Sequence, residues 1–168
     1  MNDEQRTRPS MVADDRASLT SFLDYQRATL AMKCQGLSGE QLKRKAIPTT
    51  ELTLLGLVRH VASVERSWFR FALGAEDVTT LWPGQVDGAS AEFHVEDADA
   101  DEAFEVWREE CVRARAVAES FASVDDTVDC GGATISLRYV LTHMIEEYAR
   151  HNGHADLLRE AIDGAVGE

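Results

Sequence analysis

Apolar residues recur along most of the chain at intervals of three and four, the spacing that places them on one side of an α-helix. Glycine, proline and polar segments divide this pattern into separate stretches. The pattern predicts helices over residues 14–37, 53–73, 99–123 and 136–162. The segment 127–135 has β character but is too short to support a sheet, so we expect an all-α fold.

Residues that favour helix ends support these boundaries. A threonine at 49, 50 or 53 can cap the second helix and Ser136 the fourth, because their side chains accept from free backbone N–H groups. Gly74 and Gly164 are expected to end the same two helices. Residues 1–13 contain Pro9 and many charges and are expected to form a flexible tail, which leaves 14–168 as one domain.

The connections predict how the helices are arranged. About 25 residues, 75–98, separate the second helix from the third, whereas antiparallel neighbours need only a few. We therefore predict a four-helix bundle with a long crossover between helices two and three. The alternative is a simple up-and-down bundle in which this connection, with Trp82, forms a functional lid.

Composition excludes several classes of function. The chain has 168 residues, 17 Lys and Arg against 30 Asp and Glu, and a formal net charge of −13. Such a charge disfavours nonspecific binding to nucleic acid or anionic membranes. We find no apolar run of about 20 residues and no apolar signal core, so we expect a cytoplasmic protein with no membrane span. Cys34, Cys111 and Cys130 form no CxxC pair, which argues against a disulfide framework or an all-cysteine zinc site.

Three of the five histidines lie in the fourth predicted helix. At about 100° per residue, Glu147 and His151 lie about 40° and 80° from His143 around the helix axis. His154 lies about 20° from the same reference, so all four side chains share one face. Ionisable groups on an inward face are costly unless they are paired or coordinated. His94, in the polar crossover, is expected to be solvated.

His60 in the second helix shares its face with apolar side chains and is expected to point into the core. With two groups one turn apart on the fourth helix, it would place three ligands around one point, as in catalytic zinc sites. Spacing alone allows three such pairs: His143/Glu147, Glu147/His151 and His151/His154. Without a metal, the same residues would form a buried polar network in which His60 is hydrogen-bonded to Glu147.

Two stretches, LLGLVRHVASVERSWF and SLRYVLTHMIEEYARHNGHADLLREAIDG, resemble the DinB-like superfamily of metal-binding four-helix bundles over about residues 18–164. The resemblance is closest to the branch of mycothiol-dependent maleylpyruvate isomerase and related thiol S-transferases. It implies a long crossover, a homodimer, and a divalent metal held by His60, Glu147 and His151. His154 stands where a glutamine is frequent, so the resemblance places it beside the ligands, and His143 against the core or cavity wall.

Two neutral histidines and one carboxylate leave a divalent ion with net positive charge, which favours an anionic fourth ligand. Such an ion would deprotonate a thiol and hold it for attack on an electrophile. The resemblance therefore implies a mycothiol-type S-transferase with a divalent metal. We expect zinc, although nickel, iron and manganese suit the same donors. The alternatives are a metal-binding stress or detoxification protein without turnover, and a metal-dependent hydrolase. For a hydrolase, Glu146 is poorly placed as a base.

Other residues of the second helix and the aromatic residues receive less specific expectations. We expect Arg59, Arg66 and Arg70 to face solvent, with an anionic substrate as their alternative partner. Trp68, Trp107 and Tyr148 are expected to be packing residues, and Met144 and Tyr139 to fill the bundle.

Overall fold

Most of the chain is helical in the computed structural model, which describes residues 6–86 and 88–167. The long helices are α1 (Asp15–Cys34), α3 (Leu54–Glu65), α4 (Ala100–Ser120) and α5 (Leu137–Asp163). A short helix, α2 (Gly39–Leu42), follows α1, and a 3-10 turn, η2 (Ala91–Phe93), precedes α4. The prediction of an all-α fold is confirmed.

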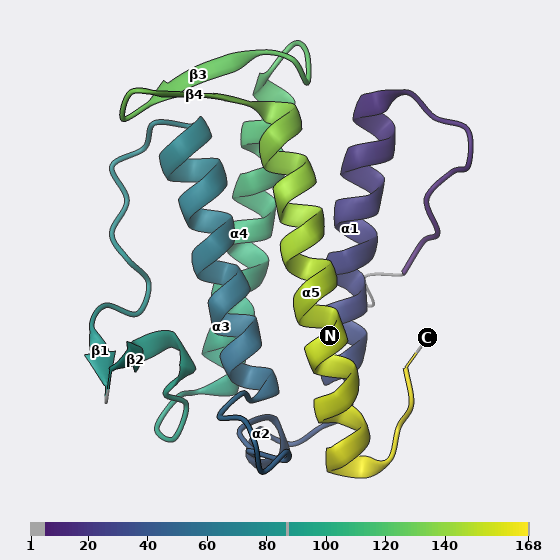
Figure 1. Cartoon of the computed structure of the whole chain (residues 1–168), viewed down its shortest axis with the longest axis vertical. Coiled ribbons are helices and arrows are strands. Elements are labelled where there is room, and N and C mark those ends of the chain that lie inside the picture. The colour runs from purple at the N-terminus through teal and green to yellow at the C-terminus, as the bar shows by residue number, and fades with distance from the viewer. Residues whose placement is uncertain (1–5, 87, 168) are drawn as a thin grey trace.

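The long helices lie side by side, and the chain runs down α1, up α3, up α4 and down α5 (Figure 1). Two successive helices can point the same way because residues 75–98 return along the length of the molecule before α4 begins. This is the predicted crossover. Helix α1 packs mainly on α5, and α3 packs on both α4 and α5, so the core is enclosed between them.

Side-chain caps begin the long helices at the expected positions. Thr53 accepts a hydrogen bond from the N–H of Gly56, and Ser136 accepts one from the N–H of Tyr139. At the end of α5, Gly164 has a φ angle of 80°, a left-handed conformation that glycine adopts without strain. These local signals fix where α3 and α5 start, and therefore which turns of the two helices face each other.

Residues 127–136 form a two-stranded antiparallel hairpin, so the prediction that this segment is too short to support a sheet was wrong. Strand β3 (Thr127–Cys130) pairs with β4 (Ala133–Ser136). Gly131 and Gly132 have φ angles of 61° and 88°, which permits a two-residue turn whose twist matches that of the strands. A second pair in the crossover, β1 (Gln85–Val86) with β2 (Ala89–Ser90), is shorter still.

The helix that begins as α3 continues beyond Glu65 with a different hydrogen-bond pattern. Residues Arg66–Leu73 form η1, a π-helix, in which the N–H of Gly74 donates to the carbonyl of Phe69, five residues earlier, at 2.8 Å. A Cβ atom at position 74 would lie 2.8 Å from the carbonyl oxygen of Arg70, so only glycine fits there. No feature of the sequence predicted this segment. Isolated π-helical turns occur often at functional sites.

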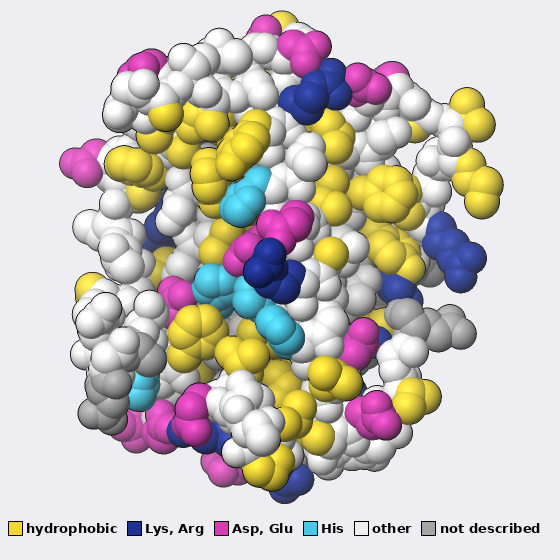
Figure 2. Space-filling model, viewed as in Figure 1, with side chains coloured by type: hydrophobic (Ala, Val, Ile, Leu, Met, Phe, Trp, Pro, Cys, Tyr) yellow, Lys and Arg dark blue, Asp and Glu magenta, His cyan; other side chains and the backbone are white. Residues whose placement is uncertain are grey.

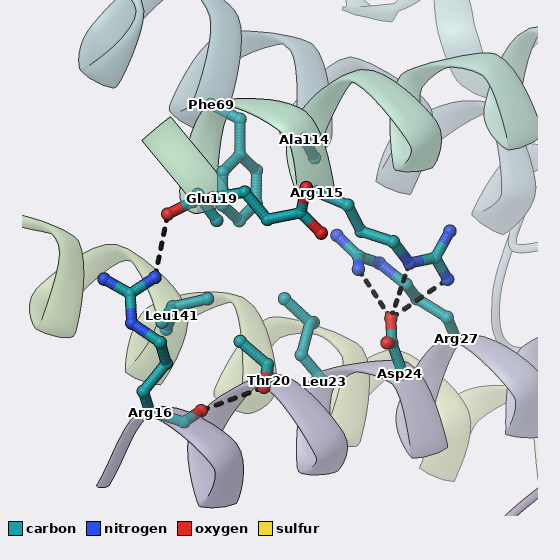
Figure 3. Close-up of a pocket in the computed structure, with 11 residues that line it drawn as sticks. Arg16, Thr20, Leu23, Asp24, Arg27, Phe69, Ala114, Arg115, Glu119 and Leu141 are labelled. Carbon is teal, nitrogen blue, oxygen red and sulfur yellow. Dashed lines mark hydrogen bonds and ion pairs between the residues drawn. The ribbon is translucent and has the colours of Figure 1, made fainter. Parts of the chain in front are cut away.

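A cavity of about 310 Å³ separates part of α1 from α4 (Figure 3). At one end Asp24 accepts hydrogen bonds from Arg27 at 2.8 Å and from Arg115 at 3.0 Å. At the other end Arg16 donates to two carbonyls at the end of α4. The charged arginines therefore connect α1 to α4 within the fold. No histidine is among the described residues that line this cavity.

The N-terminal segment before α1 contains no helix or strand over residues 6–14. Arg6 donates to Thr29 at 3.1 Å and lies over the ring of Tyr25. Residues 1–5 of the predicted tail lie outside the described residues, and the boundary between tail and domain stays a prediction. Within the described chain, no helix combines the length and the apolar character needed to cross a membrane.

Candidate metal centre

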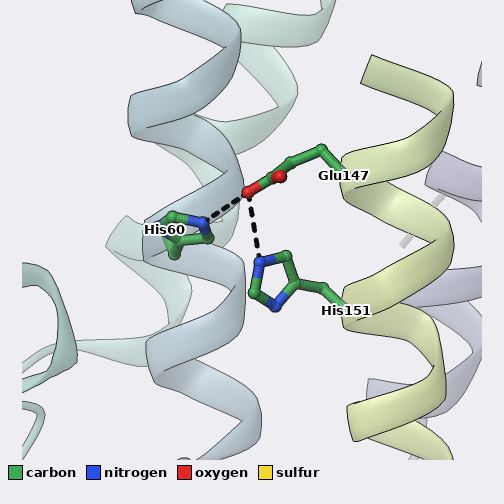
Figure 4. Close-up of side chains that lie close together, drawn as sticks. All are labelled: His60, Glu147 and His151. Carbon is green, nitrogen blue, oxygen red and sulfur yellow. Dashed lines mark hydrogen bonds and ion pairs between the residues drawn. The ribbon is translucent and has the colours of Figure 1, made fainter. Parts of the chain in front are cut away.

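His60, Glu147 and His151 come together between α3 and α5 (Figure 4). The Nε2 atom of His60 lies 2.9 Å from Glu147 Oε1, and the Nε2 atom of His151 lies 3.2 Å from the same oxygen. Of the three ligand pairs that spacing allowed on the fourth helix, the fold brings Glu147 and His151 to His60. The donor atoms of all three residues lie within 4.8 Å of one another.

The local structure explains this meeting. Glu147 and His151 are four residues apart on α5, so their side chains lie on neighbouring turns of one face. His60 projects from the middle of α3 toward that face. All three side chains are only partly buried, and histidines lie in a row at the surface over α3 and α5 in Figure 2. The cluster is therefore reachable by a small molecule.

A carboxylate from the crossover holds the far side of His60. Glu92, in η2, lies 2.8 Å from His60 Nδ1. Ionised carboxylates only accept, so His60 donates from Nδ1 to Glu92 and from Nε2 to Glu147. A bound ion would take the place of the Nε2 proton, while Glu92 keeps the other proton on Nδ1. Sequence reasoning missed Glu92 because no spacing rule relates it to His60 32 residues earlier.

His154 has a similar relation to His151. The Nδ1 atoms of these two residues lie 3.4 Å apart, one turn of α5 apart in sequence. His151 donates from Nε2 to Glu147, so its Nδ1 accepts from His154. A bound ion in place of the Nε2 proton would move the proton of His151 to Nδ1, which then donates to His154. His154 therefore lies beside the cluster, in contact with His151. A residue that hydrogen-bonds to the ring nitrogen not used for the metal fixes the tautomer and the orientation of a metal-binding histidine.

Burial and neighbouring charges shift the pKa values in opposite directions. Burial alone would lower the pKa of His60, but hydrogen bonds to Glu92 and Glu147 raise it above its ordinary value. Burial and the nearby His60 lower the pKa of His151. Burial disfavours the charge of Glu147, yet the hydrogen bond from His60 and the charge of His151 hold the pKa of this carboxyl below its usual range. A bound cation would thus replace a proton that two carboxylates attract to His60.

The donor set fits a divalent metal ion. Tetrahedral ligands at about 2.1 Å from zinc lie about 3.4 Å from one another. The contacts to Glu147 Oε1, 2.9 and 3.2 Å, need to lengthen only by a few tenths of an ångström. Two imidazoles and one carboxylate leave a fourth position open, which is typical of catalytic sites.

The remaining histidines lie outside this cluster. His143 packs on the rings of Trp68 and Tyr139, and its Nδ1 lies 3.8 Å from Glu146. Glu146 itself is hydrogen-bonded to Arg150 at the surface. His94 lies in the crossover, where its backbone carbonyl accepts from the side chain of an arginine. The His143/Glu147 pair that spacing allowed is therefore not the pair that meets His60 in the described structure.

That arginine, Arg59, is buried, which contradicts the expectation that it faces solvent. Its guanidinium lies 4.7 Å from the ring centre of Trp82 in the crossover and donates to the His94 carbonyl. The ring of Phe93 stacks on His60 at 5.3 Å between centroids. A Cβ atom on Gly56 would come within 3.3 Å of Phe93, so a glycine allows this close approach. Trp82 thus anchors the crossover beside the site.

Arg66 and Arg70 were also expected to face solvent, but both pair with a buried carboxylate. Both donate to Glu110 of α4, at 2.6 and 3.0 Å, and the carboxylate of Glu110 is almost fully buried. The two arginines join η1 to α4 and are not placed to meet a substrate. Their pairing could not be predicted because it joins residues 40 and 44 positions apart.

A second buried network ties the long helices together behind the cluster. Glu65 of α3 accepts two hydrogen bonds from Arg27 of α1, at 2.8 and 2.7 Å. Tyr148 of α5 donates to Glu65 at 2.8 Å and accepts from Trp107 of α4 at 2.8 Å. Trp107 and Tyr148 are therefore more than packing residues. Since Tyr148 follows Glu147 directly, this network fixes the turn of α5 that carries the cluster.

Replacing Glu92 by alanine is expected to weaken metal binding by about 10- to 100-fold, because His60 loses the partner that fixes its tautomer. Glu92→Gln should retain more affinity, since its amide oxygen can still accept from Nδ1. Glu96→Ala removes an exposed carboxylate of the same crossover and serves as the control. Competition with a chromophoric chelator measures the affinities, and equal values for Glu92→Ala and Glu96→Ala would contradict the role assigned to Glu92.

The fold and the cluster define a class: an all-α protein whose facing helices carry two histidines and a glutamate at an accessible site. A family model described as mycothiol-S-transferase matches residues 18–164, and the chain belongs to this DinB-like family. No curated protein sequence matches the chain.

Proposed function

We propose that the chain is a metal-dependent mycothiol S-transferase, in which a divalent ion activates the thiol of mycothiol for attack on an electrophile. The observation that carries the proposal is the meeting of His60, Glu147 and His151 in a chain of this family. We propose zinc as the ion, because His/His/Glu with an open position is a frequent zinc arrangement; nickel, iron and manganese remain alternatives.

A divalent ion held by these residues would lower the pKa of a thiol that binds to it, so that the thiolate is present at neutral pH. The protein supplies the geometry. Glu92 keeps the proton of His60 on Nδ1, and His154 can do the same for His151. Glu147 contributes a single negative charge, so an ion of charge +2 keeps an excess of positive charge for an anionic sulfur.

The chain's own thiols are unsuited to this role. Burial raises the pKa of Cys34 to about 12. Burial and the nearby Glu65 carboxylate raise the pKa of Cys111 even further. Cys130 lies in the β3–β4 hairpin and not in the cluster. A nucleophilic sulfur at the candidate metal centre must therefore come from a small-molecule thiol.

A hydrolase with the same ion is less favoured, because Glu92 is hydrogen-bonded to His60 Nδ1 and Glu146 is paired with Arg150 and His143 at the surface. A metal-binding protein without turnover would use the same ligands. Turnover with a thiol distinguishes it from the transferase. The homodimer and the cytoplasmic location predicted from the sequence are part of the proposal and need measurements of their own.

The proposal is tested by the rate at which the zinc-loaded protein consumes mycothiol with butyl glycidyl ether, a simple epoxide. We expect consumption above the uncatalysed rate, a fall of at least about 100-fold after chelation or in His60→Ala, and recovery of the chelated protein with zinc. His94→Ala should retain the wild-type rate. Metal binding without any thiol-dependent consumption would favour the non-catalytic alternative.

A further inference from the structure

The face of α5 that carries the cluster continues toward the β3–β4 hairpin. Tyr139, His143, Glu147 and His151 follow one another at intervals of four residues. Neighbouring members of this series are therefore about 6 Å apart along the helix axis. His143 lies one turn, and Tyr139 two turns, from the carboxylate of the candidate metal centre.

Trp68 of η1 lies against the two aromatic members of this series. Its ring centroid is 4.7 Å from that of His143 and 5.9 Å from that of Tyr139. The rings of Tyr139 and His143 are parallel to within 4°, with centroids 6.1 Å apart. The π-helical segment and α5 thus form an aromatic surface next to the cluster, which we call the aromatic subsite (Trp68, Tyr139 and His143).

The aromatic subsite is accessible from solvent. Tyr139 is 52% exposed, so the expectation that it fills the bundle was wrong, and the side chain of His143 is 27% exposed. Figure 2 shows hydrophobic side chains on the same face as the row of histidines, immediately above it. A molecule seated on these rings would have its other end within one or two helical turns of Glu147.

The chemistry of these side chains favours one kind of occupant. Aromatic rings attract another planar ring through edge and face contacts that a flexible alkyl chain does not make. Glu146, 3.8 Å from His143 Nδ1, is paired with Arg150, so the edge of the subsite has no net charge that would favour a charged ring substituent. The fitting ligand is therefore an uncharged aryl group joined to a short electrophilic arm.

We propose that the aromatic subsite binds the aryl group of the electrophile, so that uncharged aryl electrophiles are the preferred substrate class. This inference rests on the proposed function. With an aryl epoxide, the thiol sulfur forms a bond to the terminal epoxide carbon and the C–O bond of the ring breaks. The epoxide oxygen takes the proton that the thiol releases, and the reaction needs no oxidant or further reactant.

Phenyl glycidyl ether and butyl glycidyl ether carry the same epoxide and differ only in the aryl or alkyl group. The wild-type protein should show a kcat/KM that is about three- to tenfold higher for the phenyl compound, after correction for the uncatalysed rates. Trp68→Leu and Tyr139→Leu should bring this ratio close to one. Phe71→Leu removes another exposed aromatic side chain of η1 and should leave the ratio unchanged.

Binding of unreactive analogues separates this inference from the proposed function. 3-Phenoxy-1,2-propanediol should quench the fluorescence of the wild-type protein and bind more tightly than 3-butoxy-1,2-propanediol. The quenching should disappear in Trp68→Leu, whereas Tyr139→Leu, at an exposed position, should fold normally and bind more weakly. If neither epoxide reacts but the phenyl diol binds selectively, the transferase proposal fails, whereas aryl binding by the aromatic subsite is supported. Equal binding of the two diols, or a phenyl preference unchanged in both variants, would overturn the subsite.

Discussion

Replacing Arg27 by methionine should lower the free energy of unfolding by about 3–5 kcal/mol, because it leaves the carboxylate of Glu65 buried without its cation. Arg27 is 2% exposed and Glu65 is fully buried. Burial disfavours the charge of Arg27, but the adjacent Glu65 carboxylate outweighs this effect and raises its pKa well above the ordinary value. The two groups therefore depend on each other for their charged states.

The loss should arise from the orphaned charge and not from the missing contact. After the substitution, the donors that remain to Glu65 among the described residues are neutral, Tyr148 at 2.8 Å and Cys111 at 3.7 Å. A double variant, Arg27→Met with Glu65→Leu, should recover much of the lost stability, since apolar groups can replace a buried ion pair at little cost. It should not recover all of it, because the hydroxyl of Tyr148 then lacks its acceptor.

Urea denaturation followed by circular dichroism measures these differences. Arg150→Met breaks an exposed pair with Glu146 and should change the stability by less than about 1 kcal/mol. If Arg27→Met is no more destabilising than Arg150→Met, the buried pair does not hold the helices together. If the double variant is as unstable as Arg27→Met, the lost contact itself, and not the orphaned charge, explains the effect.

Replacing Glu147 by alanine should abolish stoichiometric metal binding. The carboxylate oxygen faces both His60 and His151, so its removal leaves two histidines on different helices and removes the one negative charge among the three proposed ligands. Metal content per chain, measured by inductively coupled plasma mass spectrometry after loading with zinc and extensive dialysis, should fall from near one to near zero. Thiol-dependent turnover should fall with it.

Glu146→Ala provides the matched control, because it removes a carboxylate one residue away that points to the surface. It should keep the wild-type metal content. If the wild-type protein takes up no zinc, nickel, iron or manganese, the cluster is a hydrogen-bonded network, and the transferase proposal fails. If Glu147→Ala keeps its metal, the ion is bound elsewhere in the chain.

The helices could be predicted from the sequence with errors of a few residues, because helix formation depends on the spacing of apolar residues and on caps such as Thr53 and Ser136. The long connection over 75–98 indicated the crossover because antiparallel neighbours need only a few connecting residues. The hairpin over 127–136 was missed because two four-residue strands give a weak periodic signal. The π-helix was missed because it depends on backbone hydrogen bonds that the side-chain pattern does not encode.

For the site, the sequence by itself determined that Glu147 and His151 share a face of one helix and that His60 shares its helix face with apolar residues, because both facts follow from helical periodicity. The expectation that His60 points into the core was wrong, since its side chain is 19% exposed beside α5. The tertiary structure alone decided which pair meets His60, since that depends on how α3 and α5 are aligned. It also decided that Glu92 holds His60, that Arg27 pairs with Glu65, and that Trp68 faces Tyr139 and His143. Each of these contacts joins residues 32 or more positions apart or depends on the π-helix, so local pattern contains no information about them.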